Sequence, residues 1–257
     1  MALTALQVCA AIDSFAPFAL AEVWDNVGLL AGSPDMQVRG ILCALELNPM
    51  VLEEALRQDC NLIVTHHPIL FGGRKNLCED TAEGRLLCRL VRAHMNLIAA
   101  HTNYDVAVGG VNDCLAAVLG LSNVHCVDGD EEAILRIGDV EPMTAAAFAA
   151  RVTERLGDVV RVYGDRQKLV RRVALVGGAG GEYAQLALRA GADAYVTGEM
   201  RYHDSVSLAA EGLVTMQAGH DSTEQIAVKP LRNGLQMRAN ALQYNVKVYA
   251  NDLGVEE

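Results

Sequence analysis

The segment NLIVTHHP, residues 61–68, joins a short apolar run to two adjacent histidines and a proline. The run at 61–65 is brief and aliphatic, which predicts a buried β-strand. Adjacent imidazoles after a buried run are costly unless they find partners, and Pro68 prevents a helix from continuing there. The segment therefore predicts a strand of an α/β sheet whose carboxyl end carries polar chemistry.

The same order of short apolar strand, turn and helix recurs along the chain. We expect strands at 40–47, 61–65, 96–100, 134–137, 172–176, 194–197 and 213–218, and helices at 3–16, 49–58, 82–95, 110–119, 143–156 and 182–190. Strands that alternate with helices predict an α/β fold with mainly parallel sheets sheathed by helices. The acidic, turn-rich segment at 128–132 predicts a domain junction.

The composition is that of a globular protein, with 51% hydrophobic and 21% charged residues among 257. A formal net charge of −11 repels nucleic-acid backbones and anionic lipid, so neither is an expected partner. The odd number of cysteines, seven, favours reduced thiols. The apolar N-terminus lacks a cationic segment and no apolar stretch reaches membrane-span length, so we expect a cytoplasmic protein.

Further polar groups follow two other expected strands. Asp105, after the strand at 96–100, could supply a carboxylate that bridges two cations, although a helix cap or turn residue explains it as well. His101 could instead form a hydrogen bond with a metal ligand without binding the metal itself. The 213–218 strand is followed by His220 and Glu224, and Glu224 alone could equally be an acid favoured by the helix dipole.

Ser222 and Gln225 resemble a capping box, which predicts a helix that begins near Ser222. Three histidines and two carboxylates at strand ends form a nitrogen and oxygen ligand set suited to two divalent ions roughly 3.5–4 Å apart. Zinc, iron, manganese and nickel all fit imidazole and carboxylate ligands. The candidate metal ligands are His66, His67, Asp105, His220 and Glu224.

Three other segments have weaker interpretations. The glycine-rich loop at 177–181 could cradle phosphate, but it lacks the lysine of a P-loop and is better explained by close packing. Glu199, Arg201 and His203 could line a substrate pocket or belong to a solvated loop. The segment at 24–28 (WDNVG) contains the only tryptophan, and no role follows from its sequence.

Taken in order, these motifs resemble the Nif-three-like family of dinuclear-metal hexameric proteins, whose members often carry the name GTP cyclohydrolase I type 2 homologue. The resemblance spans residues 24 to 224. It rests on Trp24 to Gly28, Thr65 to Pro68, His101 to Asp105, Gly109 to Asp113, Thr197 to Glu199, and Gly219-His220 with Glu224.

The resemblance implies a short-form member with a second α/β domain inserted into the first. We place the metal-binding domain at 1–125 plus 218–257 and the inserted domain at 126–217. It also implies the same five metal ligands, two divalent ions per chain and a homohexameric ring. Glu46 and Thr223 depart from the residues usual in that family, and neither is a ligand position.

Two functions follow as hypotheses. The first is a metal-dependent hydrolase acting on a nucleotide, with GTP cyclohydrolase activity as the named case and Glu199, His101 and His203 as candidate catalytic proton carriers. A phosphoester hydrolase is a variant of it. The second is a non-catalytic protein for metal binding, metal delivery or interaction, because ligands alone do not demonstrate turnover.

Overall fold

The computed structural model describes residues 3–72, 76–127, 129–130 and 133–251. The chain divides into two compact units, of which unit 1 comprises residues 1–108 and 228–257 and unit 2 comprises residues 109–227. Each unit contains one β-sheet covered by helices, which confirms the expected α/β fold class. The seven expected strands are therefore divided between two separate sheets.

Unit 1 is built on a five-stranded sheet with the order β1-β4-β3-β2-β11. All neighbouring strands run parallel except β1, which pairs antiparallel with β4 at one edge. Central strands of a parallel sheet are buried on both faces, which explains their continuous apolar sequences. The strands are β1 (Gly28–Ala31), β2 (Gly40–Ala44), β3 (Leu62–Thr65), β4 (Asn96–Ala99) and β11 (Lys247–Ala250).

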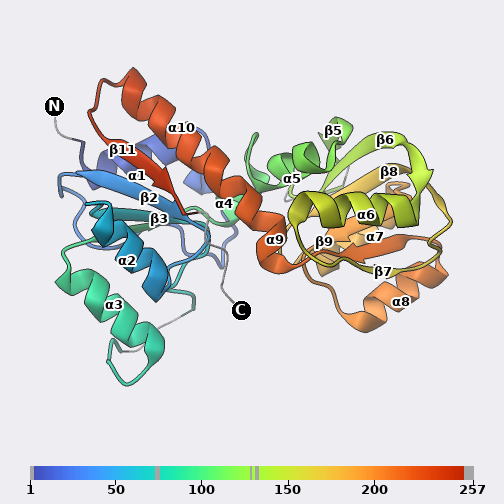
Figure 1. Ribbon diagram of the computed structural model, residues 1–257, viewed down its shortest axis with the longest axis horizontal. Helices are drawn as coiled ribbons and strands as arrows, with labels where there is room; N and C mark the ends of the chain where they lie inside the picture. Colours follow the sequence, from blue (N-terminus) through green and yellow to red (C-terminus); the bar gives the residue numbers. More distant parts are fainter. Residues whose placement is uncertain (1–2, 73–75, 128, 131–132, 252–257) are drawn as a thin grey trace. The chain divides into compact units, whose positions relative to one another are not determined.

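Helices cover both faces of this sheet (Figure 1). Helices α2 (Pro49–Arg57) and α3 (Ala82–Arg92) share one hydrophobic core with the sheet, while α1 (Ala5–Asp13) and α10 (Val228–Ala241) pack together and contact β1, β2 and β11. Asn48 and Thr81 begin α2 and α3 by accepting hydrogen bonds from the first-turn amides. One short helix, α4 (Thr102–Val106), follows β4 directly.

Unit 2 contains a six-stranded sheet with the order β5-β6-β8-β9-β10-β7. Strands β8, β9 and β10 are parallel, whereas the pairs β5–β6, β6–β8 and β7–β10 are antiparallel. The sheet is therefore mixed rather than mainly parallel. Its strands are β5 (Ser122–Cys126), β6 (Arg136–Thr144), β7 (Arg161–Tyr163), β8 (Leu169–Val176), β9 (Ala194–Thr197) and β10 (Val214–Gln217).

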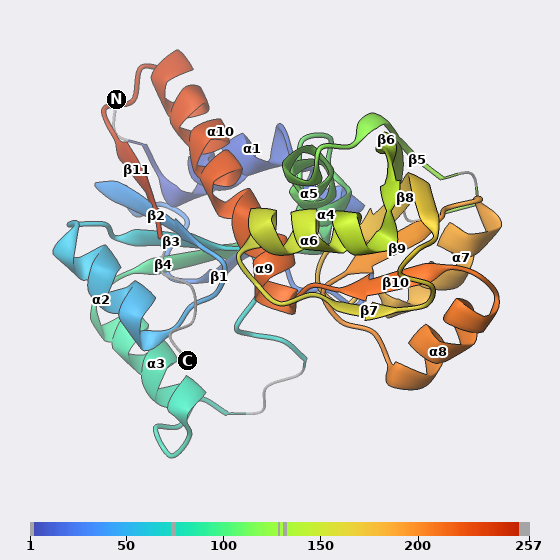
Figure 2. The ribbon, with the colours of Figure 1, turned by 45° about the vertical axis from the view of Figure 1, so that its right-hand side comes forward.

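Two separate cores lie on the two faces of this sheet (Figure 2). Helices α5 (Val111–Leu119) and α6 (Ala145–Leu156) pack on one face around the buried Phe148. Helices α7 (Ala184–Arg189) and α8 (Tyr202–Ala210) cover the other face around Tyr195. Helix α5 ends at Gly120, which adopts a left-handed φ of 77° that favours glycine.

The boundaries between the units differ from the expected ones. The sequence placed the second domain at 126–217, whereas the structure divides the chain after residues 108 and 227. Helix α5 accounts for the first difference, because Leu115, Ala116 and Leu119 are buried in the core of unit 2. The junction expected at 128–132 coincides with neither boundary, and its residues 128, 131 and 132 lie outside the described residues.

All seven cysteines lie among the described residues as free thiols, and two of them, Cys78 and Cys126, are exposed. Cys43 and Cys60 are buried, and burial raises the pKa of the Cys60 thiol to about 12. Within the described ranges, no helix is both long enough and apolar enough to cross a membrane.

The central position of Phe148 gives a test of the unit 2 core. Phe148 is fully buried among the side chains of α5, α6 and the sheet. We expect Phe148→Ala to lower the free energy of unfolding by about 3–5 kcal/mol, because it leaves a cavity in a close-packed core. Urea denaturation of this variant and of Val159→Ala, at a side chain 80% exposed, checks the expectation. Equal losses in both would contradict it.

Candidate metal centre

His66 and His67 are fixed by the sheet that precedes them. They follow β3 directly, and their amides donate to the carbonyl oxygens of Ala44 and Leu45, at N···O distances of 3.2 and 2.8 Å. The histidine pair therefore continues the pairing between β2 and β3 past the last regular strand residue. This ladder, rather than a flexible loop, positions the two imidazoles.

The imidazole of His66 has a defined protonation pattern. Its Nδ1 lies 2.9 Å from the carbonyl oxygen of Ala100, and a carbonyl only accepts, so Nδ1 carries the proton. In the neutral imidazole Nε2 then bears the lone pair, and this atom lies 3.5 Å from Asp105 Oδ1. Both side chains are buried. A neutral histidine with an available Nε2 is the form that binds metal ions.

His101 is held in the same way by a carboxylate. Its Nδ1 lies 2.9 Å from Asp25 Oδ1, and the other Asp25 oxygen accepts from the amide and hydroxyl of Thr102. Burial tends to raise the pKa of Asp25, but the hydrogen bonds from His101 and Thr102 outweigh it and bring the pKa down to about 2. Asp25 is therefore a buried, ionised acceptor that fixes the orientation of His101.

These side chains gather in one group within unit 1. The rings of His66 and His67 lie 5.1 Å apart between centroids, and the His101 ring lies 5.1 Å from His66 and 5.7 Å from His67. One nitrogen from each of the three rings lies within 4.8 Å of the others, a spacing that could hold a metal ion. We call His66, His67, His101 and Asp105 the histidine group.

Unit 2 contains a second polar group, at the carboxyl ends of β9 and β10. The short helix α9 (His220–Glu224) follows β10, and His220 Nε2 lies 3.3 Å from Glu224 Oε2. On the other side of the ring, Nδ1 lies 3.1 Å from Glu199 Oε1. Glu224 is buried, whereas the Glu199 side chain is 63% exposed. His220 thus stands between a buried and an exposed carboxylate.

Both carboxylates act on the charge of His220. The hydrogen bond with Glu224 raises the pKa of His220, with further contributions from the charges of Glu224 and Glu199, to about 9 despite partial burial. In the absence of a metal ion the imidazole is therefore protonated at neutral pH. A metal ion that bound Nε2 would have to displace that proton.

Two glycines allow this group to pack closely. A Cβ atom at Gly178 would lie 2.1 Å from Glu224 Oε1, and one at Gly198 would lie 2.8 Å from the Cα atom of His220. Gly178 also has a φ of +58°, in the left-handed region. Gly178 in the loop and Gly198 in the Thr197–Glu199 turn therefore leave the space that Glu224 and His220 occupy.

The loop at 177–181 uses its amides internally. Three of its N–H groups donate to side-chain oxygens of the same unit, which are those of Asn112, Thr223 and Thr197. Amides committed to such bonds are not available to a phosphate, so close packing, the interpretation that the sequence favoured, accounts for this loop.

Two local expectations require correction. The helix predicted to begin near Ser222 begins at His220, because Gly219 adopts a φ of +87° and turns the chain immediately after β10. Ser222 donates its hydroxyl to Asp158 instead of capping the helix. Asp105 lies within helix α4 and not in a loop. Of the expected catalytic residues, His203 lies on α8, where its ring contacts Tyr202.

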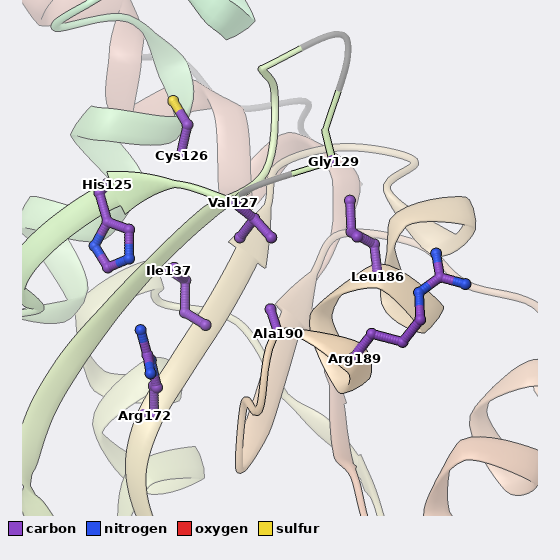
Figure 3. Close-up of a pocket in the computed structure, with 9 residues that line it drawn as sticks. All are labelled: His125, Cys126, Val127, Gly129, Ile137, Arg172, Leu186, Arg189 and Ala190. Carbon is purple, nitrogen blue, oxygen red and sulfur yellow. The ribbon is translucent and has the colours of Figure 1, made fainter.

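Other cavities lie within unit 2. Glu199 and Arg201 line a pocket of about 650 Å³ together with Gly181 and Glu182, and His203 is not among its described lining residues. Another, of about 490 Å³, lies between α7 and the exposed ends of β5, β6 and β8, and Figure 3 shows His125 and Arg172 among the residues that line it. Among the described residues its lining contains no carboxylate, unlike the two polar groups.

Sequence reasoning found no role for Asp25 or for the pairing of Glu199 with His220. Asp25 and His101 are 76 positions apart in the chain, and Glu199 and His220 are 21 apart. Within a single sequence nothing relates such distant residues.

The chain matches the profile of the Duf34/NIF3 (NGG1p interacting factor 3) family over residues 3–253. A protein of Clostridium acetobutylicum named GTP cyclohydrolase 1 type 2 homolog is 29% identical over 263 residues, which cover 100% of this chain and 98% of that protein. A Streptomyces coelicolor protein of the same name is 35% identical over 229 residues, or 85% of this chain and 80% of that protein.

Solved structures agree with this match. The crystal structure of a Staphylococcus aureus hypothetical protein superposes with a TM-score of 0.92 at 29% identity, covering 100% of this chain and 99% of that one. A Bacillus cereus protein related to NIF3 also gives a TM-score of 0.92, at 25% identity, covering 100% and 98% of the two chains.

The contact between Gly178 and Glu224 can be tested by a matched pair of variants. We expect Gly178→Ala to lower the free energy of unfolding by about 2–4 kcal/mol, because the new Cβ meets a buried carboxylate and adopts a left-handed φ. Gly157→Ala, at φ +78° with open space around it, shares only the backbone strain and should lose about 1 kcal/mol. Urea denaturation measures both, and equal losses would show that the collision is relieved without cost.

The raised pKa of His220 predicts a pH dependence of stability in metal-free protein. The folded pKa of about 9 exceeds the usual 6.5, so the stabilisation is complete below pH 6.5 and is lost as the pH rises through about 9. Partial exposure screens the interaction, so we expect a loss of about 1 kcal/mol. Denaturation with chelator across this range should show the loss in wild type and not in His220→Gln. Parallel profiles for the two proteins would refute it.

Proposed function

The chain belongs to the Duf34/NIF3 family, and from that premise we propose that it is a dinuclear-metal hydrolase that acts on a nucleotide. The observation that carries the metal-binding part is the histidine group. Three imidazole nitrogens lie within 4.8 Å of one another, and the hydrogen bond from Nδ1 directs Nε2 of His66 towards Asp105, a second proposed ligand.

The proposed ligands of the two ions are His66, His67, Asp105, His220 and Glu224. The donor set fits divalent transition ions, because neutral imidazole and carboxylate suit zinc, iron, manganese or nickel. It contains no thiolate, and the two buried carboxylates have oxygens that can bridge a pair of cations. Divalent ions at such a centre act as Lewis acids and lower the pKa of water towards neutrality.

The protein's own residues would orient the donors and carry protons. Asp25 accepts a hydrogen bond from Nδ1 of His101, and Glu199 accepts one from Nδ1 of His220. Each carboxylate thereby orients the ring so that Nε2 faces away from it. Glu199, His101 and His203 are the proposed proton carriers. The exposure of Glu199 supports its role, because an exposed carboxylate exchanges protons directly with water.

The nucleotide substrate is supported by the names of relatives. The Clostridium acetobutylicum and Streptomyces coelicolor proteins are both named GTP cyclohydrolase 1 type 2 homolog, so GTP is the first substrate to test. We also propose a homohexameric ring, on the basis of the family resemblance of the motifs.

Metal analysis tests the binding part. We expect untagged protein, reloaded with zinc or manganese, to retain at least about one ion per chain. His66→Asn should weaken binding by at least about 10- to 100-fold, the loss typical of mutating a hydrogen-bond partner of a ligand, because it removes a buried ligand itself. His125→Asn is the control, since this exposed histidine lies in the pocket of Figure 3 and not in the histidine group. Retention of less than one ion per chain after reloading would refute the proposal.

A turnover assay tests the catalytic part. Metal-loaded protein is incubated with GTP and then with a set of nucleotides and phosphoesters, and release of formate, pterin precursor or phosphate is measured. Turnover that needs metal and is lost in His66→Asn but not in His125→Asn supports the hydrolase. Tight metal binding without turnover on any substrate would favour the alternative, a non-catalytic metal-binding or metal-delivery protein.

A further inference from the structure

Two large aromatic side chains lie exposed side by side in unit 1. Trp24 is 60% exposed and Phe71 is 59% exposed, and their ring centroids lie 5.7 Å apart at an interplanar angle of 73°. Aromatic side chains of this size usually bury most of their surface in a fold. An adjacent exposed pair therefore marks a surface on which another molecule can be accommodated.

The exposure of Trp24 does not come from a loose segment. The next residue, Asp25, has a fully buried side chain that accepts hydrogen bonds from His101 and Thr102. Asn26 donates its side-chain amide to the carbonyl oxygen of Leu70, 2.6 Å away. These bonds tie the segment at 24–26 to the ends of β3 and β4, so the indole is held at the surface in a fixed position.

The aromatic pair adjoins the histidine group. The His101 ring lies 6.2 Å from the Trp24 ring and 6.3 Å from the Phe71 ring. On its other sides the same imidazole lies 5.1 Å from His66 and 5.7 Å from His67. A fixed apolar surface beside a few convergent polar groups is the usual composition of a small-molecule site.

We infer that Trp24 and Phe71 bind a planar heteroaromatic ring of the nucleobase kind, while the histidine group faces the reacting part of the same ligand. This rests on the proposed function and assigns the two rings as its specificity-determining residues. A cation is a poorer occupant, because the carboxylate that adjoins Trp24 in the chain, Asp25, is fully buried and committed to His101 and Thr102. Every nucleobase has a π-face, and this face stacks on aromatic side chains whatever substituents the base carries.

The single tryptophan provides a direct test, because Trp24 is the only one among 257 residues. Its fluorescence is recorded during titration of the full chain with guanosine, GTP and ribose 5-phosphate. Each titration is made with metal-free protein and again with protein loaded with zinc, an ion that does not quench by a redox or paramagnetic route. We expect saturable quenching by guanosine and GTP and none by ribose 5-phosphate.

Two variants separate ring binding from a general effect. Phe71→Ala should weaken guanosine binding roughly 5- to 100-fold while the tryptophan emission remains measurable. Tyr202→Ala is the matched control, because Tyr202 is 62% exposed and lies on α8 of unit 2, and its affinity should equal that of wild type. Calorimetry with Trp24→Ala checks the result without the fluorophore.

The outcomes distinguish this inference from the proposed function. Guanosine binding that persists in protein unable to retain zinc would sink the metal function and leave the ring site intact. Zinc binding without quenching by any ring compound would overturn the ring site alone. Equal quenching by ribose 5-phosphate, or unchanged affinity in Phe71→Ala, would also overturn it. So would a change of oligomeric state in Trp24→Ala without ring binding, which would make the pair a contact between copies.

Discussion

A buried imidazole N–H must donate a hydrogen bond to an acceptor. For Nδ1 of His66 that acceptor is the carbonyl oxygen of Ala100. Ala100 follows β4, and His66 follows β3, so this single hydrogen bond joins the ends of two neighbouring parallel strands. It fixes the tautomer and the direction of Nε2 together. The parallel register of β3 and β4 therefore fixes the direction of the His66 imidazole.

Carboxylates repeat this arrangement at the other histidines. Asp25 holds His101 in unit 1, and Glu199 holds His220 in unit 2. The two carboxylates differ in burial, because the Asp25 side chain is fully buried while that of Glu199 is 63% exposed. Asp25 is thus a fixed part of the scaffold, whereas Glu199 can exchange protons with solvent.

Glycines set how closely the second group can pack. Side chains at Gly178 or Gly198 would occupy the space that Glu224 and the His220 backbone now fill. Three amides of the loop at 177–181 donate hydrogen bonds to threonine and asparagine side-chain oxygens. A glycine-rich loop between a strand and a helix, which in another protein binds phosphate, here serves the packing of a polar group.

The fold class and the strands that end in polar residues follow from the sequence. Apolar runs of four or five residues, with helix caps such as Asn48 and Thr81 between them, are local features that periodicity can detect. The strands β1, β5, β7 and β11 were not predicted. Each lies at an edge of its sheet, where a strand is less buried and its apolar pattern is a weaker signal. Helix α5 was assigned to the wrong side of the boundary, since its apolar face does not indicate which sheet buries it.

The sequence by itself determined which polar residues follow the buried strands, because an apolar run and the residues after it are local features. Only the tertiary structure decided how they are held. The partners Asp25 and His101 are 76 positions apart, and Trp24 meets His101 only because β1 and β4 pair at the sheet edge. Hydrogen-bond partners, tautomers and ring contacts depend on the register between strands, which local sequence does not specify.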